Sequence, residues 1–126
     1  MHALLIPLIS LLLTLAPLPT DVQRPRVTGH YSNMRMSAET GDLGGEQLYI
    51  TSSRSGFYAL FQMAEGSPDV PVLVPLVVEG AIIKFEFPSD SKYARGLRSF
   101  EGTITATGLT GRFANGYQVT LPRLPC

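Results

Sequence analysis

The sequence is poor in cysteine, tryptophan and charge. Its only cysteine is Cys126, so no disulfide and no cysteine metal cluster can form within this chain. Tryptophan is absent. Charged residues make up only 16% of the chain, and ten acidic residues balance ten basic ones. Without a basic excess to neutralise phosphates, we expect no nucleic acid partner and no binding to anionic lipid by charge alone.

The first twenty residues lack charge altogether. Residues 1–20 contain no Asp, Glu, Lys or Arg, and 3–18 are almost wholly apolar. This run is shorter than the ~20 residues that a membrane-spanning helix needs, and it suits the apolar region of a secretion signal. We therefore expect a signal helix over 1–20, cleaved near Thr20 so that the mature chain begins at Asp21. An uncleaved anchor is the alternative. The expected location is periplasmic or secreted, with no stable membrane span after cleavage.

The rest of the chain lacks helical periodicity. Residues 21–27 are interpreted as an extended lead-in, and 28–126 as one domain of short alternating runs punctuated by Gly, Asn, Asp and Pro, which is typical of strands. We also expect a helical turn at 92–95 and a tight turn at 108–111. The strands are expected over 29–37, 47–52, 57–63, 70–78, 81–87, 99–106, 112–114 and 117–121.

Short connections between successive strands favour an antiparallel meander. The predicted fold class is all-β: about seven or eight strands that form a small barrel or a barrel-like sandwich, since closure removes bare sheet edges.

Both ends of this meander carry a residue pattern known from small barrels. Gly29-His30-Tyr31 opens the first strand, and Arg123 follows the last strand. This arrangement resembles the calycin superfamily of lipocalins and avidins, in which Gly-x-Trp opens the barrel and an arginine packs over the ring. Here Tyr31 replaces the tryptophan. The resemblance implies a barrel, a contact between Tyr31 and Arg123, and a small hydrophobic ligand in the barrel mouth. The same glycine-punctuated pattern is common in exported bacterial β proteins.

The aromatic residues allow two interpretations. Strand alternation places most phenylalanines on inward faces, where they form either a filled core or the wall of a hollow barrel. A filled core is the simpler expectation for a domain of this size. In the hollow case, a small apolar ligand would contact Met34, Met36, Phe57, Phe61, Met63, Phe85 and Phe87.

Catalytic and metal-binding patterns are scarce. After the leader, His30 is the only histidine, and no Gly-x-Ser-x-Gly motif occurs. We expect no cofactor and no metal site. Glu39, Asp42 and Glu46 flank one glycine-rich hairpin, which leaves a carboxylate hydrolase as an alternative. We interpret these three as a solvated turn.

Proline interrupts one expected strand. Pro71 and Pro75 lie four residues apart in 70–78, and neither has an N–H to donate. Pro71 can belong to the preceding turn. At Pro75 we expect regular pairing toward one neighbour to break, which would leave a seam where a partner or ligand docks.

These observations favour a non-enzymatic exported protein that binds a small apolar ligand or an envelope partner. The first alternative is an interaction protein with a filled core, and the second is the hydrolase of the Glu39–Glu46 region.

Overall fold

The computed structural model describes residues 26–125 of the chain. The expected signal helix over 1–20 lies outside this part, as does Cys126. Within 26–125 the chain forms strands, turns and irregular segments but no helix. None of these residues belongs to a helix that is long and apolar enough to cross a membrane.

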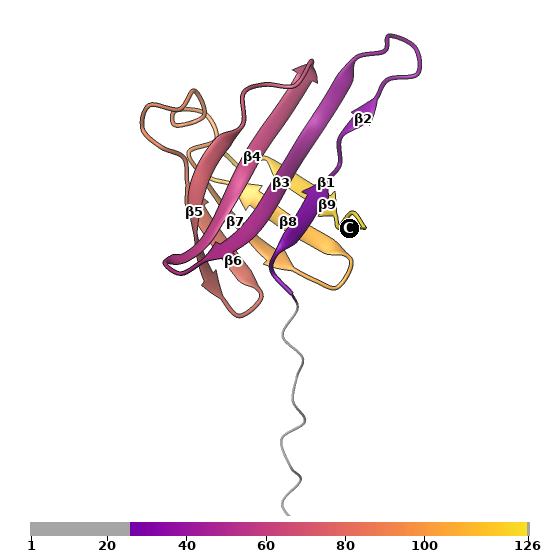
Figure 1. Cartoon of the computed structure of the whole chain (residues 1–126). Coiled ribbons are helices and arrows are strands. Elements are labelled where there is room, and N and C mark those ends of the chain that lie inside the picture. The colour runs from indigo at the N-terminus through magenta and orange to yellow at the C-terminus, as the bar shows by residue number, and fades with distance from the viewer. Residues whose placement is uncertain (1–25, 126) are drawn as a thin grey trace, which may run out of the picture.

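The described chain folds into one antiparallel sheet of nine strands (Figure 1). Burial alternates along its strands with the period of two that a sheet with one covered face requires. The strands are β1 (Gly29–Ser32), β2 (Arg35–Met36), β3 (Leu43–Ser53), β4 (Gly56–Gly66), β5 (Val72–Glu79), β6 (Ile82–Glu86), β7 (Ser99–Ile104), β8 (Gly108–Phe113) and β9 (Gln118–Pro122).

The sheet curls into a nearly closed barrel. Neighbouring strands follow the order β1-β3-β4-β5-β6-β7-β8-β9, and β2 pairs with β3 beside β1. The end of β9 returns to β1, where Tyr31 forms an isolated bridge with Arg123 and the Leu124 N–H donates to the His30 carbonyl at 2.8 Å. The all-β antiparallel meander expected from the sequence is thus confirmed, with β1 and β2 as an interrupted first strand.

The interruption of the expected strand 29–37 has a local cause. A regular ladder would bring the Glu46 N–H to the Asn33 carbonyl, but the Asn33 side-chain Oδ1 accepts it instead, at 2.7 Å. The Asn33 N–H still donates to the Glu46 carbonyl at 3.1 Å. The side chain has replaced one rung of the ladder, and pairing resumes at Arg35.

The expected turn at 108–111 is wrong, because these residues begin β8. Leu109 is buried in the core, and the real turn lies just before, where the Thr105 N–H donates to the Gly108 carbonyl at 2.8 Å. Close packing, rather than a turn, requires glycine at positions 108 and 111. A Cβ on Gly108 would lie 2.6 Å from the Leu121 carbonyl, and one on Gly111 would collide with the Phe100 ring.

The helical turn expected at 92–95 is also absent. The segment 87–98 consists of hydrogen-bonded turns, in which Ala94 donates to Ser91 at 3.1 Å and Arg98 donates to Tyr93 at 2.9 Å. Its chain is held by Tyr93, whose side chain is buried against the barrel. Packing of that ring, rather than a helical ladder, shapes the segment.

Aromatic side chains fill the interior. Phe61 lies in contact with four other rings, and ring centroids in this cluster are 5.0–6.4 Å apart, within the range of favourable aromatic packing. The buried rings of the cluster are Phe61, Phe85, Phe87, Tyr93, Phe100 and Phe113.

Strand β5 changes partner at its proline. Its pairing with β4 runs from Val72 to Leu76 and includes Pro75, whereas its pairing with β6 covers only Val77 to Glu79. Regular pairing toward β6 therefore stops at Val77 and leaves both Leu76 and Pro75 unpaired on that side. The sequence predicted a break at Pro75, because proline has no N–H to donate. Val74 and Leu76 are nevertheless buried, so the break does not open the core.

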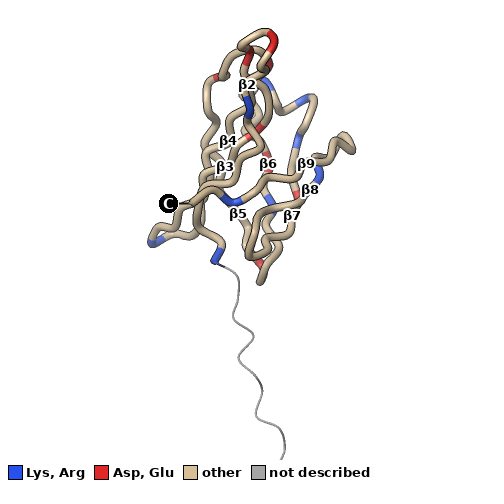
Figure 2. The backbone as a smooth tube through the Cα atoms, turned by 90° about the vertical axis from the view of Figure 1, so that its right-hand side faces the viewer, with Lys and Arg blue, Asp and Glu red and all other residues tan. Residues whose placement is uncertain are grey.

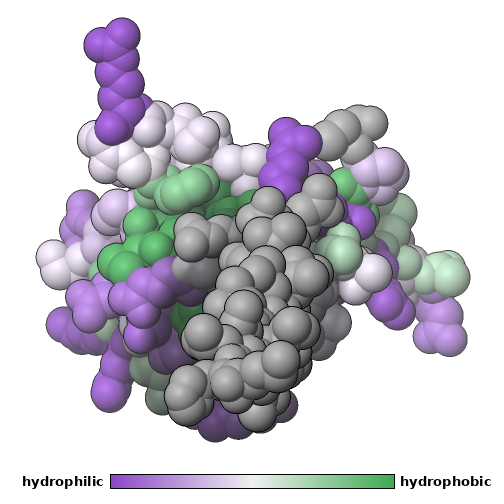
Figure 3. All heavy atoms as spheres, turned by 90° about the horizontal axis from the view of Figure 1, so that it is seen from below, coloured by the Kyte–Doolittle hydropathy of each residue, from purple (hydrophilic) through white to green (hydrophobic). Residues whose placement is uncertain are grey.

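The two ends of the barrel differ in their connections. One end carries the tight links 54–55, 80–81 and 105–107, together with the contact between β1 and β9. We call it the closed end; Figure 3 views the barrel from this side, where apolar and hydrophilic residues both reach the surface. The opposite, open end carries the longer connections 37–42, 67–71, 87–98 and 114–117.

Candidate functional site

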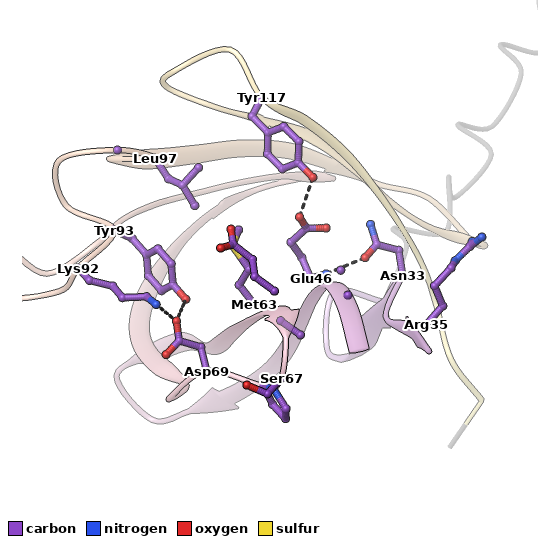
Figure 4. A pocket seen from close by; sticks show the side chains of 16 residues that line it. Asn33, Arg35, Glu46, Met63, Ser67, Asp69, Lys92, Tyr93, Leu97 and Tyr117 are labelled. Carbon is purple, nitrogen blue, oxygen red and sulfur yellow. Dashed lines mark hydrogen bonds and ion pairs between the residues drawn. The ribbon is translucent and has the colours of Figure 1, made fainter. Parts of the chain in front are cut away.

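A cleft lies at the open end of the barrel, between the longer connections. Its volume is about 1120 Å³. Figure 4 shows its side chains, which come from β2, β3 and β4, from Asn33 before β2, from the segments 67–71 and 87–98, and from the β8–β9 turn. This open-end cleft is lined by Asn33, Arg35, Gly44, Gly45, Glu46, Met63, Ala64, Glu65, Ser67, Pro68, Asp69, Lys92, Tyr93, Gly96, Leu97 and Tyr117.

Tyr93 separates the cleft from the core. Its ring packs edge-on against Phe61 at 5.4 Å and lies 5.2 Å from Phe87, and its side chain is buried. The hydroxyl donates to Asp69 Oδ2 at 2.9 Å, and Lys92 forms an ion pair with the same carboxylate. Burial, and then the nearby Glu65 carboxylate, raises the pKa of Tyr93. The uncharged Tyr93 phenol therefore forms the bottom of the cleft and separates it from the filled core.

Glu46 is the buried carboxylate of the site. It stands on β3 with only 5% of its surface exposed. Tyr117, 71 residues further along the chain, donates its hydroxyl to Glu46 Oε1 at 2.7 Å (Figure 4). This hydrogen bond is the main cause of the raised pKa of Tyr117, followed by burial and by the charges of Glu46 and Glu65. The Tyr117 ring is stacked on Phe113, with centroids 5.9 Å apart, which ties the site to the core.

The candidate ligand-binding residues do not gather in one place. Phe61, Phe85 and Phe87 are buried against one another in the core. Phe57 is half-buried near the closed end of β4. Of the methionines, Met63 lines the open-end cleft, Met34 is half-buried between β1 and β2, and Met36 is 68% exposed.

The candidate carboxylates are separated as well. Glu39 and Asp42 are exposed in the β2–β3 turn, whereas Glu46 is buried in the cleft. Among residues 26–125, no group of three or more His, Cys, Asp or Glu side chains is placed to hold a metal ion. His30 lies on the outer face, stacked on Tyr49 with centroids 3.8 Å apart.

The closed end brings Tyr31 and Arg123 together, as the sequence pattern predicts. The guanidinium carbon lies 4.7 Å from the centre of the Tyr31 ring. Arg123 also donates to the carbonyls of Thr28, at 3.0 Å, and Arg26. Tyr31 is fully buried and donates its hydroxyl to the Val27 carbonyl at 2.7 Å. These contacts join the end of β9 to β1 and nearly close the barrel at this end.

A second depression of about 1270 Å³ runs from Pro75 across β6 and β7 to β8. Its outward side chains include Lys84, Glu101 and Arg112, which are neighbours across successive strands. Opposite charges placed side by side in this way are typical of the solvated face of a sheet. The open-end cleft, with its buried carboxylate, is the better candidate site.

Sequence reasoning did not identify Tyr93, Asp69 and Tyr117 as site residues. The sequence offered only a weak signal for Tyr93 and Tyr117. Both stand in mostly polar, irregular connections, where a large aromatic ring is expected to pack against the rest of the protein. Their partners, Asp69 and Glu46, lie 24 and 71 residues away in the chain, so no local pattern predicts these contacts.

The chain matches no protein-family model, and no curated protein or solved structure is significantly similar to it. The function is therefore inferred from the geometry of the site.

Proposed function

We propose that this chain is an exported, non-enzymatic binding protein whose small ligand lies in the open-end cleft. The observation that carries the proposal is a cavity of about 1120 Å³ with a buried carboxylate, Glu46, in its wall. Sites for small molecules are typically concave, of roughly 300–1,000 Å³, with a few placed polar groups. Export is inferred from the uncharged, apolar residues 1–20.

A relationship to the calycins is part of this proposal. It is supported by Gly29 and Tyr31 at the start of β1, by the meander that returns to its first strand, and by the Arg123 guanidinium over the Tyr31 ring. By that resemblance the ligand belongs in the barrel mouth. Because the interior is filled and the cleft lining is mixed, a ligand with polar groups is favoured over a purely apolar one.

The alternative, an interaction protein with a filled core that binds an envelope partner, is favoured by one observation. Tyr49, Leu60 and Leu73 are neighbours across β3, β4 and β5 on the outer face, and each is more than 40% exposed. Native mass spectrometry of protein purified from its host separates the two. A bound small mass supports the cleft, and a clean dimer supports the interaction protein.

The direct test is a fragment screen followed by amide NMR. Fragments that bind are expected to shift amides of 44–46, 65–69 and 92–97. Gly44 offers a blocking variant, because its Cβ would meet no atom within 4 Å and its backbone does not require glycine. Gly44→Phe should therefore fold but lose the fragments, whereas Thr51→Phe, on the exposed far part of the same strand, should keep them. Fragments that shift only the outer face, or that still bind to Gly44→Phe, would refute the proposal.

A further inference from the structure

The Glu46 carboxylate has one oxygen, Oε2, that can still accept a hydrogen bond. Tyr117 donates to its Oε1, and no described side chain donates to Oε2. Yet within 26–125 no buried side-chain oxygen or nitrogen lacks a partner. Oε2 is therefore not sealed inside the wall but opens into the cleft that Glu46 lines. Although 95% of the Glu46 surface is buried, one carboxylate oxygen can therefore contact a ligand in the cleft.

Among residues 26–125, no basic side chain forms an ion pair with Glu46. The ion pair found among residues 26–125 joins Lys92 to Asp69, on the other side of the site (Figure 4). Three acidic residues, Glu46, Glu65 and Asp69, line the cleft against two basic ones, Arg35 and Lys92. Figure 2 shows both acidic and basic positions at this end of the barrel. A buried carboxylate is costly without a counter-charge, so the site is electrostatically incomplete.

The walls next to Glu46 suit an organic cation rather than a bare ion. The Tyr117 ring stands beside the carboxylate, and Met63 lies between the Glu46–Tyr117 and Asp69–Tyr93 pairs in Figure 4. Aromatic faces attract cations, and a thioether packs well against apolar or aromatic groups. Burial mainly raises the pKa of Tyr93, and the hydrogen bond to Glu46 mainly raises the pKa of Tyr117; the Glu65 carboxylate adds a smaller contribution in the same direction to both.

We propose that the open-end cleft binds a small organic molecule through an ammonium group, which pairs with Glu46 Oε2 while the apolar body lies against Met63 and Tyr117. This inference rests on the proposed function and specifies its ligand. Charge-assisted hydrogen bonds are about twice as strong as neutral ones, so the ammonium would dominate selectivity.

The test uses three probes of equal size and different charge: benzylamine, which is an ammonium ion at neutral pH, benzyl alcohol and benzoate. Each is titrated into the wild-type protein by amide NMR. Benzylammonium should saturate the amides around Glu46 with an affinity at least about tenfold above that of benzyl alcohol, and benzoate should not bind. Because this series uses the unmodified chain, its result does not depend on the folding of any variant.

A variant pair identifies the residue responsible. Glu46→Gln keeps an oxygen that can accept from Tyr117 but removes the charge, so it should lower the affinity for benzylammonium about tenfold and leave benzyl alcohol unchanged. Asp42→Asn removes the same charge from the exposed β2–β3 turn and should have no effect.

The possible failures are distinct. Equal binding of all three probes in the cleft would overturn the ammonium inference and leave the proposed function standing. Probes that shift no amide of the cleft would overturn the inference, and a fragment screen that also misses the cleft would overturn the proposed function.

Discussion

Each end of this barrel has a tyrosine that contacts a charged side chain. The two pairs differ in whether one hydrogen-bonding group stays free to contact a ligand. At the closed end, Arg123 covers the Tyr31 ring and donates to backbone carbonyls, while Tyr31 donates to Val27. At the open end, Tyr117 donates to one oxygen of Glu46, and the other oxygen faces the cleft.

The difference follows from burial and from connection length. Tyr31 has no exposed surface, so its ring and hydroxyl both need partners from the protein, whereas Tyr117 is 46% exposed. Tight links connect the strands at the closed end, whereas the longer segments 67–71 and 87–98 line a cleft at the open end. The first pair is therefore expected to serve stability and the second to serve binding.

Removing each tyrosine in turn should produce the largest difference between the two ends. Tyr31→Ala deletes a fully buried ring and should lower the free energy of unfolding by about 3–5 kcal/mol. Tyr117→Ala deletes a half-exposed ring and its hydrogen bond to the buried Glu46 carboxylate, and should cost about 1–3 kcal/mol. Urea denaturation of both variants measures the difference. Equal losses would show that the open end is as much a structural clasp as the closed one.

A smaller effect tests how the closed-end pair works. The Arg123 guanidinium over the Tyr31 ring should contribute about 0.5–2 kcal/mol. Tyr31→Leu and Arg123→Met are therefore expected to be non-additive in a double-mutant cycle, with the double variant less destabilised than the sum of the two. As a control, Arg123→Met should be additive with Tyr117→Phe at the other end. Additivity of the first pair would mean that its members act independently.

The smallest effect is a titration that moves in opposite directions at the two ends. Burial raises the pKa of Tyr31 and Arg123 opposes this, whereas Glu46 raises the pKa of Tyr117. Arg123→Met should therefore raise the pKa of Tyr31 further, and Glu46→Gln should lower that of Tyr117. NMR of ring-labelled tyrosine follows each residue separately. Shifts of the same sign in both variants would contradict the assignment.

These pKa values also give an alkaline limit to stability. Tyr31, Tyr93 and Tyr117 have folded-state pKa values above the ordinary 10.0, so the unfolded chain releases their protons first as the pH rises. Their contribution to stability is complete below pH 10.0 and is lost as the pH rises through the folded-state values. Tyr117→Phe should make the alkaline decline less steep in denaturation measured across this range.

Much of the fold could be predicted because it depends on local rules. Alternation in 81–87 placed Ile83 and Phe85 inside and Lys84 outside, as the structure has them. A break in pairing next to Pro75 was predicted from its missing N–H, and the pairing toward β6 stops at Val77. Where prediction failed, at 108–111, the glycines made room for Phe100 and for β9, and such close approach depends on neighbours that are remote in the chain.

The candidate site was less predictable for the same reason. The sequence singled out Glu46 only as one of three carboxylates around a hairpin. The Tyr117 hydroxyl that donates to it lies 71 residues away in the chain. Among the candidate ligand-binding residues, Met63 reaches the cleft, while Phe61, Phe85 and Phe87 fill the core.

Side-chain alternation and turn residues act within a few positions of the chain, so the all-β meander and the inward face of most strands could be predicted locally. The filled core and the contact between Glu46 and Tyr117 arise only when the whole barrel folds. Both outcomes depend on barrel closure, since the curvature of the whole sheet sets how much interior remains and which connections face each other across its mouth.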